Sequence, residues 1–281
     1  MSAFGGASVR EALDSEVIAI AAAGSDTPRL DAEVLLADAL GVDRTALFMD
    51  PAREVEGPAV RAFQDAVRRR SAGREPVAYI TGRRGFRHLD LAVDARVLVP
   101  RPETELLVEI GVELLAPGAR VVDVGTGSGA IALALAQERP DLEVLATDSS
   151  AGALDVARAN AARLGLDGAV RFAEGDLLAG AGTVDAVLSN PPYIAERDRA
   201  VLAPEITRHE PPGALFAGED GLDVIRRLVP AAAQAAARLL AIEVGEGQSD
   251  AVAQLMHLAG FVAVHGRRDL AGIERVVVGT R

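Results

Sequence analysis

The stretch D-V-G-T-G-S-G-A, Asp123 to Ala130, joins two segments of different hydrophobic periodicity. The preceding R-V-V-D-V (Arg120 to Val124) is typical of a buried strand, and a helical pattern begins near Gly129. Gly125, Gly127 and Gly129 permit a tight turn and let a ligand come close to the backbone. The stretch therefore predicts a strand, a ligand-binding glycine loop and a helix, in that order.

Strand-like and helical segments alternate beyond Pro102, which predicts an α/β fold with a mostly parallel sheet. The last two strand-like runs, Phe261 to His265 and Arg275 to Gly279, are joined by about nine residues, too few for a helical crossover. We therefore predict a C-terminal antiparallel hairpin. The other predicted strands are Arg120–Val124, Glu143–Thr147, Val184–Ser189 and Leu239–Val244, with helices starting near Gly129, Ser150 and Asp220.

Residues 1–74 have the pattern of a small helical bundle. Ser8 and Glu11 have capping-box spacing, and Thr27-Pro28 is typical of a helix start. Gly41 predicts the end of that second helix, and Pro58 opens another. The chain thus begins with a helical domain.

A linker is predicted over residues 75–100. L-D-L-A-V (Leu89 to Val93) and V-L-V (Val97 to Val99) flank Asp94-Ala95, which favours a β-hairpin between the helical domain and a ligand-binding domain at 101–281. Residues 51–100 carry ten Arg against six acids. Either this is a solvated helix face and linker, or it is a docking surface for an acidic or nucleic-acid-bearing partner.

The composition of the 281-residue chain excludes several classes of function. It has no Cys, which excludes thiolate metal sites and cysteine nucleophiles and fits a reducing cytoplasm, and we expect no metal. All 29 basic residues are Arg, so pyridoxal enzymes and Walker-loop NTPases are excluded. The net charge of −12 argues against direct DNA binding. The apolar runs are too short for a membrane span and the N-terminus lacks the charged start of a secretion signal, so we expect a cytoplasmic location.

We expect the glycine loop to bind a nucleoside, unless it is only a tight turn between strand and helix. Asp148 lies 23 residues beyond Gly125, at the end of the next strand, where an acid can accept hydrogen bonds from both ribose hydroxyls. Gly125, Gly127 and Ala130 also satisfy the relaxed dinucleotide pattern G-x-G-x-x-A, so an NAD enzyme is an alternative. The acid at Asp123, the third glycine and the terminal hairpin together resemble the class I S-adenosylmethionine-dependent methyltransferases, whose fold is Rossmann-like.

That resemblance implies a set of cofactor contacts. Asp123 would lie near the methionine amino group, and Asp148 would bind the ribose. In E-G-D-L-L (Glu174 to Leu178), Asp176 would meet the adenine amino group and Leu177 its face, although an ordinary surface acid is an alternative there. The loop residues that would wrap the cofactor are Gly125, Thr126, Gly127, Ser128 and Gly129.

The dipeptide Pro191-Pro192 follows a predicted strand that ends at Ser189, within S-N-P-P-Y-I-A-E. Ligands of open α/β sheets bind outside the carboxyl ends of strands, so Asn190 to Tyr193 should face the cofactor. The prolines restrict the backbone and give a preformed rim, unless the segment is a plain surface turn. The Asn190 side-chain oxygen and the Pro191 carbonyl are two acceptors that match a planar –NH2 group, and the Tyr193 ring would cover its face. The same rim would touch the cofactor through Asn190.

The N-P-P-Y motif is similar to that of methyltransferases acting on exocyclic amino groups of nucleic-acid bases or on glutamine. The rest of the chain resembles the release-factor glutamine methyltransferases, the HemK/PrmC family, over nearly its whole length. Gly85 departs from the family, which usually has an acid there. The segments that carry the resemblance are Pro76–Gly82, Phe86–Val93, Val97–Glu105 with its P-R-P-E-T-E, His209–Pro211, Ala214–Asp223 and Arg268–Arg275.

The resemblance implies that the substrate is the glutamine of the Gly-Gly-Gln motif of peptide chain release factors, which would dock on the helical domain. It also places Phe86 beside the methyl-transfer site, together with Asn190, Pro191, Pro192 and Tyr193 as substrate-binding residues. An ordinary core position is the alternative for Phe86. A methyltransferase-like fold that serves only as a binding module is the alternative for the whole chain.

Overall fold

The computed structural model describes residues 6–281, in which the chain forms two compact units. The helical unit extends to Gly82 and also includes Ala203–His209; the sheet unit comprises Arg83–Leu202 and Glu210–Arg281. The sequence predicted a separate linker over residues 75–100. In the structure this segment is divided at Gly82, and its hairpin belongs to the sheet unit. Across residues 6–281, no helix combines the length and the apolar character that crossing a membrane requires. Residues 1–5, in which the N-terminus was expected to lack the charged start of a secretion signal, lie outside the described residues.

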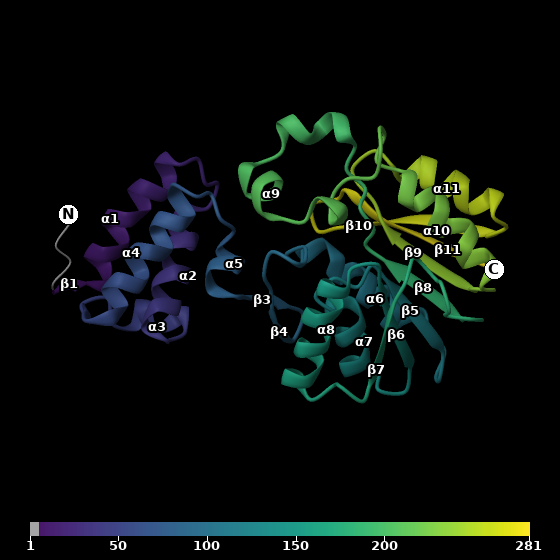
Figure 1. Cartoon of the computed structure of the whole chain (residues 1–281), viewed down its shortest axis with the longest axis horizontal. Helices are drawn as coiled ribbons and strands as arrows, with labels where there is room; N and C mark the ends of the chain where they lie inside the picture. The colour runs from purple at the N-terminus through teal and green to yellow at the C-terminus, as the bar shows by residue number, and fades with distance from the viewer. Residues whose placement is uncertain (1–5) are drawn as a thin grey trace. The chain divides into compact units, whose positions relative to one another are not determined.

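The helical unit, whose helices α1 to α5 are labelled in Figure 1, has the predicted capping signals. Ser8 Oγ accepts from the Glu11 amide at 3.3 Å, and Glu11 Oε2 accepts from the Ser8 amide at 2.8 Å. Gly41 ends the second helix in the left-handed region, at φ 64°. The helices are α1 (Val9–Ala22), α2 (Pro28–Leu40), α3 (Arg44–Met49), α4 (Pro58–Ser71), α5 (Val77–Thr81) and α9 (Pro204–His209), and the short strands β1 (Ala7–Ser8) and β2 (Glu54–Val55) pair with each other.

Helix α9 belongs to the helical unit although the chain on either side of it belongs to the sheet unit. Glu205 accepts hydrogen bonds from Arg70 Nη1 at 2.6 Å and from Arg74 Nη2 at 2.7 Å. Arg70 is 8% exposed and also donates to Asp31 at 2.6 Å. Two of the ten arginines of residues 51–100, Arg70 and Arg74, are therefore paired with acids of the helical unit itself.

The sheet unit is built on seven strands in the order β10-β11-β9-β8-β5-β6-β7 (Figure 1). Neighbours from β9 to β7 pair in parallel, and β11 pairs antiparallel with both β9 and β10. The predicted mostly parallel sheet with a C-terminal antiparallel hairpin is confirmed. The strands are β5 (Arg120–Val124), β6 (Glu143–Asp148), β7 (Val170–Glu174), β8 (Ala186–Ser189), β9 (Leu239–Glu243), β10 (Ala263–Arg268) and β11 (Glu274–Thr280).

Alternate strand residues pack into two cores, one on each face of the sheet. Val121, for example, packs with α6 and α7, whereas its neighbour Val122 packs with α10 and α11. Both faces are covered, which is why the strands are almost continuously apolar. The helices are α6 (Glu105–Leu114), α7 (Ala130–Glu138), α8 (Ala151–Leu164), α10 (Asp223–Gln234) and α11 (Ser249–Leu258), with 3-10 turns at Pro102–Thr104, Glu196–Val201 and Pro212–Ala214.

The predicted hairpin of Leu89–Val93 with Val97–Val99 is wrong. The hairpin pairs β3 (Arg83–Phe86) with β4 (Leu89–Ala92), and Arg87, at φ 49°, occupies the tight turn between them. The Val97 amide instead closes a turn by donating to the Asp94 carbonyl at 3.1 Å. Val97 and Leu98 line a cavity and Val99 is buried, so the V-L-V run is apolar without being a strand.

Candidate active site

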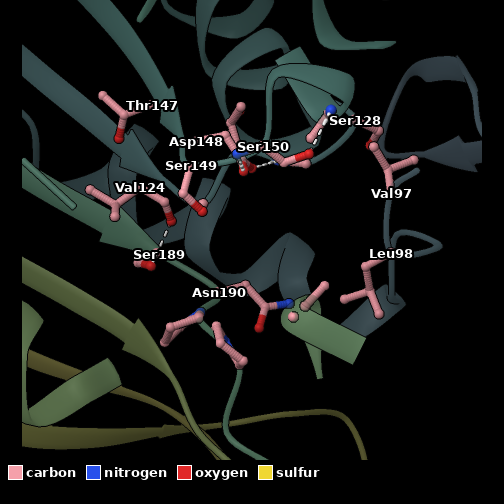
Figure 2. Close-up of a pocket in the computed structure, with 18 of the residues that line it drawn as sticks. Val97, Leu98, Val124, Ser128, Thr147, Asp148, Ser149, Ser150, Ser189 and Asn190 are labelled. Carbon is pink, nitrogen blue, oxygen red and sulfur yellow. Dashed lines mark hydrogen bonds between the residues drawn. The ribbon is translucent and has the colours of Figure 1, made fainter. Parts of the chain in front are cut away.

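A cavity of about 430 Å³ opens in the sheet unit at the carboxyl ends of β5, β6 and β8. This is the point where the chain order of the parallel strands reverses, and ligands of open α/β sheets bind there. Figure 2 shows side chains from these strand ends and from the Val97-Leu98 segment around the space. The volume lies in the range of small-molecule sites.

The glycine loop forms one wall, and its three glycines serve two different purposes. Gly125 and Gly127 have φ of 74° and 56°, and a Cβ built on either would meet no atom within 4 Å. Both line the cavity with Thr126 and Ser128, so the missing side chains leave room for a ligand. Gly129 does not line it; its Cβ would lie 2.9 Å from Leu133 Cδ1, so here glycine permits close packing at the start of α7.

Asp148 ends β6 on the cavity wall. Its Oδ2 accepts from the Gly127 amide at 3.0 Å, and its Oδ1 accepts from the Ser150 amide at 2.9 Å. A carboxylate has about four acceptor positions, so these two bonds orient the group and leave capacity for ligand hydroxyls. The predicted acid thus stands beside the glycine loop.

Asp123 lies beneath the loop and is not among the residues that line the cavity, and its contact with a cofactor amino group stays a prediction. It is fully buried, and its Oδ2 accepts from Thr126 Oγ1 at 2.6 Å and from the Ala132 amide at 3.1 Å. Its Oδ1 is buried without a hydrogen-bond partner. Burial raises the pKa of Asp123 to about 7, although the bonds from Thr126 and Ala132 oppose the shift. Asp123 therefore holds the loop against α7.

Asp176 and Leu177 line the side of the cavity beyond Asp148. The Leu177 carbonyl accepts from Thr147 Oγ1 at 2.9 Å, which fixes this residue at φ 54°. Asp176 forms an exposed ion pair with Arg227, another lining residue. The structure thus brings this weak motif to the same cavity as the glycine loop.

The Asn-Pro-Pro rim forms the wall that faces the glycine loop. Ser189, at the end of β8, donates from Oγ to the Val124 carbonyl at 2.7 Å and so joins the rim to β5. Asn190 lines the cavity, as Figure 2 shows, and so do Pro191 and Pro192. Asn190 Nδ2 donates to Thr104 Oγ1 at 3.0 Å. The rim and the loop therefore share one space.

Tyr193 and Phe86 do not line this cavity, although both were expected at the substrate. Tyr193 packs against the core on the α10 side, and its hydroxyl donates to Glu243 Oε1 at 3.2 Å. Burial, followed by the charge of Glu243, raises the pKa of Tyr193 above its usual range. Phe86 is 1% exposed within the core on the α6 side, because the tight turn at Arg87 directs β3 onto that core.

Three side chains that support the site were not predicted. Thr104, within P-R-P-E-T-E, lines the cavity, and Glu243 accepts its hydroxyl proton at 2.6 Å. An acid at the end of the apolar run L-L-A-I-E was the available signal for Glu243. Asn160 on α8 is fully buried, donates to the carbonyls of Ser128 and Ala92, and ties the glycine loop to β4. No local pattern identified it.

Comparison with known proteins gives matches along most of the chain. Residues 11–82 match the PrmC N-terminal domain family, and residues 102–211 match the methyltransferase small domain family. A release factor glutamine methyltransferase of Xylella fastidiosa (strain Temecula1) is 47% identical over 95% of this chain and 98% of its own length. The chain belongs to the release factor glutamine methyltransferase family. Relatives of the same name from Deinococcus radiodurans (97% of this chain, 98% of the relative) and Rhodospirillum rubrum (96% and 84%) are each 43% identical.

Solved structures agree with the fold of this family member. The hMettl16 catalytic domain in complex with a MAT2A 3'UTR hairpin aligns with a TM-score of 0.55, over 79% of this chain and 81% of that chain. At 16% identity the likeness shows the fold alone. The predicted class I methyltransferase fold is confirmed by this neighbour and by the methyltransferase domain match.

Proposed function

We propose that this methyltransferase transfers a methyl group from S-adenosylmethionine to the side-chain nitrogen (N5) of the glutamine in the Gly-Gly-Gln motif of peptide chain release factors. The observation that carries the proposal is the position of Asn190 and Pro191 on the cavity that the glycine loop and Asp148 also line. The family's relatives, which bear the name release factor glutamine methyltransferase, support the choice of substrate.

The residues around the cavity fit S-adenosylmethionine. The open space at Gly125 and Gly127 admits a ligand against the backbone, and Asp148 offers acceptors for two ribose hydroxyls. Leu177 gives an apolar surface for a base, and Asp176 an acceptor for its amino group. When bound, S-adenosylmethionine supplies an electrophilic methyl group. NAD would need room for a second nucleotide, and the family comparison favours the methyltransferase.

Asn190 and Pro191 supply what an amide nitrogen needs in order to react. The lone pair of that nitrogen is delocalised, so it is a poor nucleophile. Two acceptors, Asn190 Oδ1 and the Pro191 carbonyl, hold both N–H groups and fix the nitrogen's orientation. They also stabilise the positive charge that develops as the nitrogen–carbon bond forms. The methylated nitrogen then loses a proton to water, so no neighbouring base is required.

The proline pair keeps these acceptors in place. Proline has no amide hydrogen, so neither Pro191 nor Pro192 can occupy a neighbouring acceptor with a backbone bond. The fixed φ of each ring also lowers the entropy lost when substrate binds. We assign substrate docking to the helical unit and a cytoplasmic location to the protein, which the lack of cysteine supports.

Mass spectrometry of a release factor incubated with enzyme and S-adenosylmethionine tests the proposal. We expect a gain of one methyl group on the glutamine of the Gly-Gly-Gln motif, and none when that glutamine is replaced by alanine. Asn190→Ala serves as the matched enzyme control. Its cofactor affinity should be nearly unchanged, because the glycine loop is untouched, and its turnover should fall by roughly 10²–10³. No mass gain despite a stable complex would favour a binding module, and calorimetric binding of NAD in preference to S-adenosylmethionine would favour a dehydrogenase.

A further inference from the structure

A chain of hydrogen bonds runs from the cavity wall to a buried acid. Asn190 Nδ2 donates to Thr104 Oγ1 at 3.0 Å, and Thr104 Oγ1 donates to Glu243 Oε2 at 2.6 Å. The other oxygen of Glu243 accepts from the Tyr193 hydroxyl at 3.2 Å. The Glu243 carboxylate, 1% exposed at the end of β9, thus accepts hydrogen bonds from two hydroxyl groups. One hydroxyl, on Thr104, contacts the first residue of the Asn-Pro-Pro-Tyr motif, and the other belongs to its last residue.

The proton count along this chain determines which way the Asn190 amide faces. A threonine hydroxyl has one proton, and an ionised carboxylate can only accept. Because Thr104 gives its proton to Glu243, it has only lone pairs left for Asn190. The amide must therefore present its NH2 group to Thr104. Its oxygen, on the opposite branch of the planar amide, is then the atom left for a ligand in the cavity.

The opposite amide orientation would have the opposite chemistry. The oxygen and nitrogen of an asparagine amide are nearly the same in size, so packing alone does not distinguish the two orientations. A turned amide would offer a donor to the substrate NH2 group, which is itself a donor. We propose that Thr104 and Glu243 are positioning residues that hold Asn190 Oδ1 as the acceptor for the substrate nitrogen; this inference rests on the proposed function.

The protonation state of Glu243 controls the direction of these bonds. Burial raises its pKa to about 7 and the charge of Glu103 adds to the shift, whereas the bonds from Thr104 and Tyr193 and the charge of Arg275 oppose it. A proton on Oε2 would be donated to Thr104, whose own proton would then turn towards Asn190. The Asn190 amide would then turn so that its oxygen accepts this proton. Acidification through pH 7 therefore favours the unproductive amide.

Thr104→Val tests the role of the hydroxyl, because valine keeps the shape and removes both the donor and the acceptor. We expect kcat to fall about 10- to 100-fold. The loss is smaller than for Asn190→Ala, because Asn190 Oδ1 is still present and only its orientation is no longer fixed. Thr104→Ser keeps the hydroxyl and should stay within about threefold of wild type. Calorimetry should give both variants the wild-type cofactor affinity, and thermal melts should confirm that both are folded. Full turnover by Thr104→Val would overturn the inference.

A double-mutant cycle with Asn190→Ala separates positioning from general support of the fold. If Thr104 acts through Asn190, Thr104→Val should cost nothing further once Asn190 is alanine. Independent structural damage would instead multiply the two losses. A multiplied loss would therefore refute the positioning role even if both single variants are slow.

The dependence of kcat on pH tests Glu243. Wild-type kcat should rise with pH through an ionisation near 7, and Glu243→Gln, which cannot ionise, should lose that step while its amide oxygen still accepts from Thr104. The same step persisting in Glu243→Gln would overturn the role of the acid. Failure of the wild-type enzyme to methylate a release factor would refute the proposed function instead, so the two failures are distinguishable.

Discussion

Replacing Phe86 by alanine should weaken the sheet unit rather than remove a wall of the substrate pocket. The ring is 1% exposed and packs in the same core as Leu89 and Leu91. Loss of its burial costs about 2 kcal/mol. A residual void of roughly 80 Å³ at about 24 cal/mol per Å³ adds about 2 kcal/mol. The sum of about 4 kcal/mol lies in the range found for buried Phe→Ala changes.

Calorimetric melting measures this loss. For a unit of about 190 residues, a destabilisation of about 4 kcal/mol lowers Tm by roughly 8–16 °C. The demethylated cofactor product should identify the relevant transition, because a ligand of the sheet unit raises the Tm of that unit. Initial rates taken well below the melting range should show a folded variant with nearly full activity.

Phe63→Ala is the matched control. Phe63 is 3% exposed in the core of the helical unit, so its loss should lower the melting transition that the cofactor product does not move. The reasoning about Phe86 fails if Phe86→Ala melts within about 2 °C of wild type and yet loses most of its activity. That combination is the signature of a pocket wall.

Three further expectations follow from the buried and paired carboxylates. Asp148→Ala should weaken cofactor binding, measured by calorimetry, at least about tenfold, which is the loss expected for one or two hydrogen bonds to a charged group. An unchanged Kd with a lower kcat would exclude the binding of ribose by Asp148. The pKa of Asp123 is raised from 3.8 to about 7, so its stabilisation is complete below pH 4 and is lost as pH rises to about 7. Urea unfolding should therefore show Asp123→Asn improving relative to wild type from pH 4 to pH 8, and a constant difference would contradict this. Burial of Glu205 raises its pKa, but its hydrogen bonds from Arg74 and Arg70 outweigh burial and lower the pKa overall. Glu205→Gln should therefore destabilise the helical unit by about 1.5–3 kcal/mol at pH 7, and the difference from wild type should shrink as the pH falls. The control Asp65→Asn, which breaks an exposed pair with Arg68, should cost under about 1 kcal/mol.

Features that depend on local chemistry were predictable from the sequence. The capping box at Ser8, the left-handed end at Gly41 and the strand before the glycine loop all depend on residues within a few positions of one another. The alternation of apolar segments likewise predicted the parallel sheet, because each strand must be covered on both faces. Strand β7 was missed because R-F-A-E carries charges in place of a continuous apolar run.

Features that depend on long-range pairing were not predictable. Thr104 and Glu243 are 139 residues apart and meet only because the start of α6 lies against the end of β9. The capture of Glu205 by Arg70 likewise spans 135 residues. Tyr193 was assigned to the substrate from its place in the motif, but its hydroxyl has a buried carboxylate to bond, and a buried hydroxyl seldom lacks a partner. The motif predicted which residues lie on the cavity wall, Asn190 and Pro191 among them, but not the direction of the Tyr193 side chain.

Asp123 and Glu243, two buried acids of the sheet unit, each hold a cavity wall through a hydrogen bond from a threonine hydroxyl. Asp123 at the end of β5 accepts from Thr126 at 2.6 Å and holds the glycine loop; Glu243 at the end of β9 accepts from Thr104 at 2.6 Å and holds Asn190. Both have a pKa raised to about 7, so the stability that they contribute falls as pH rises from about 4 and levels off once they are ionised in the folded protein, above about pH 7. The proposed role of Glu243 requires the ionised form. Between pH 6 and 7 the stability that these groups contribute should therefore fall while kcat rises, and a kcat that falls together with stability over this range would show that the acids serve the fold alone.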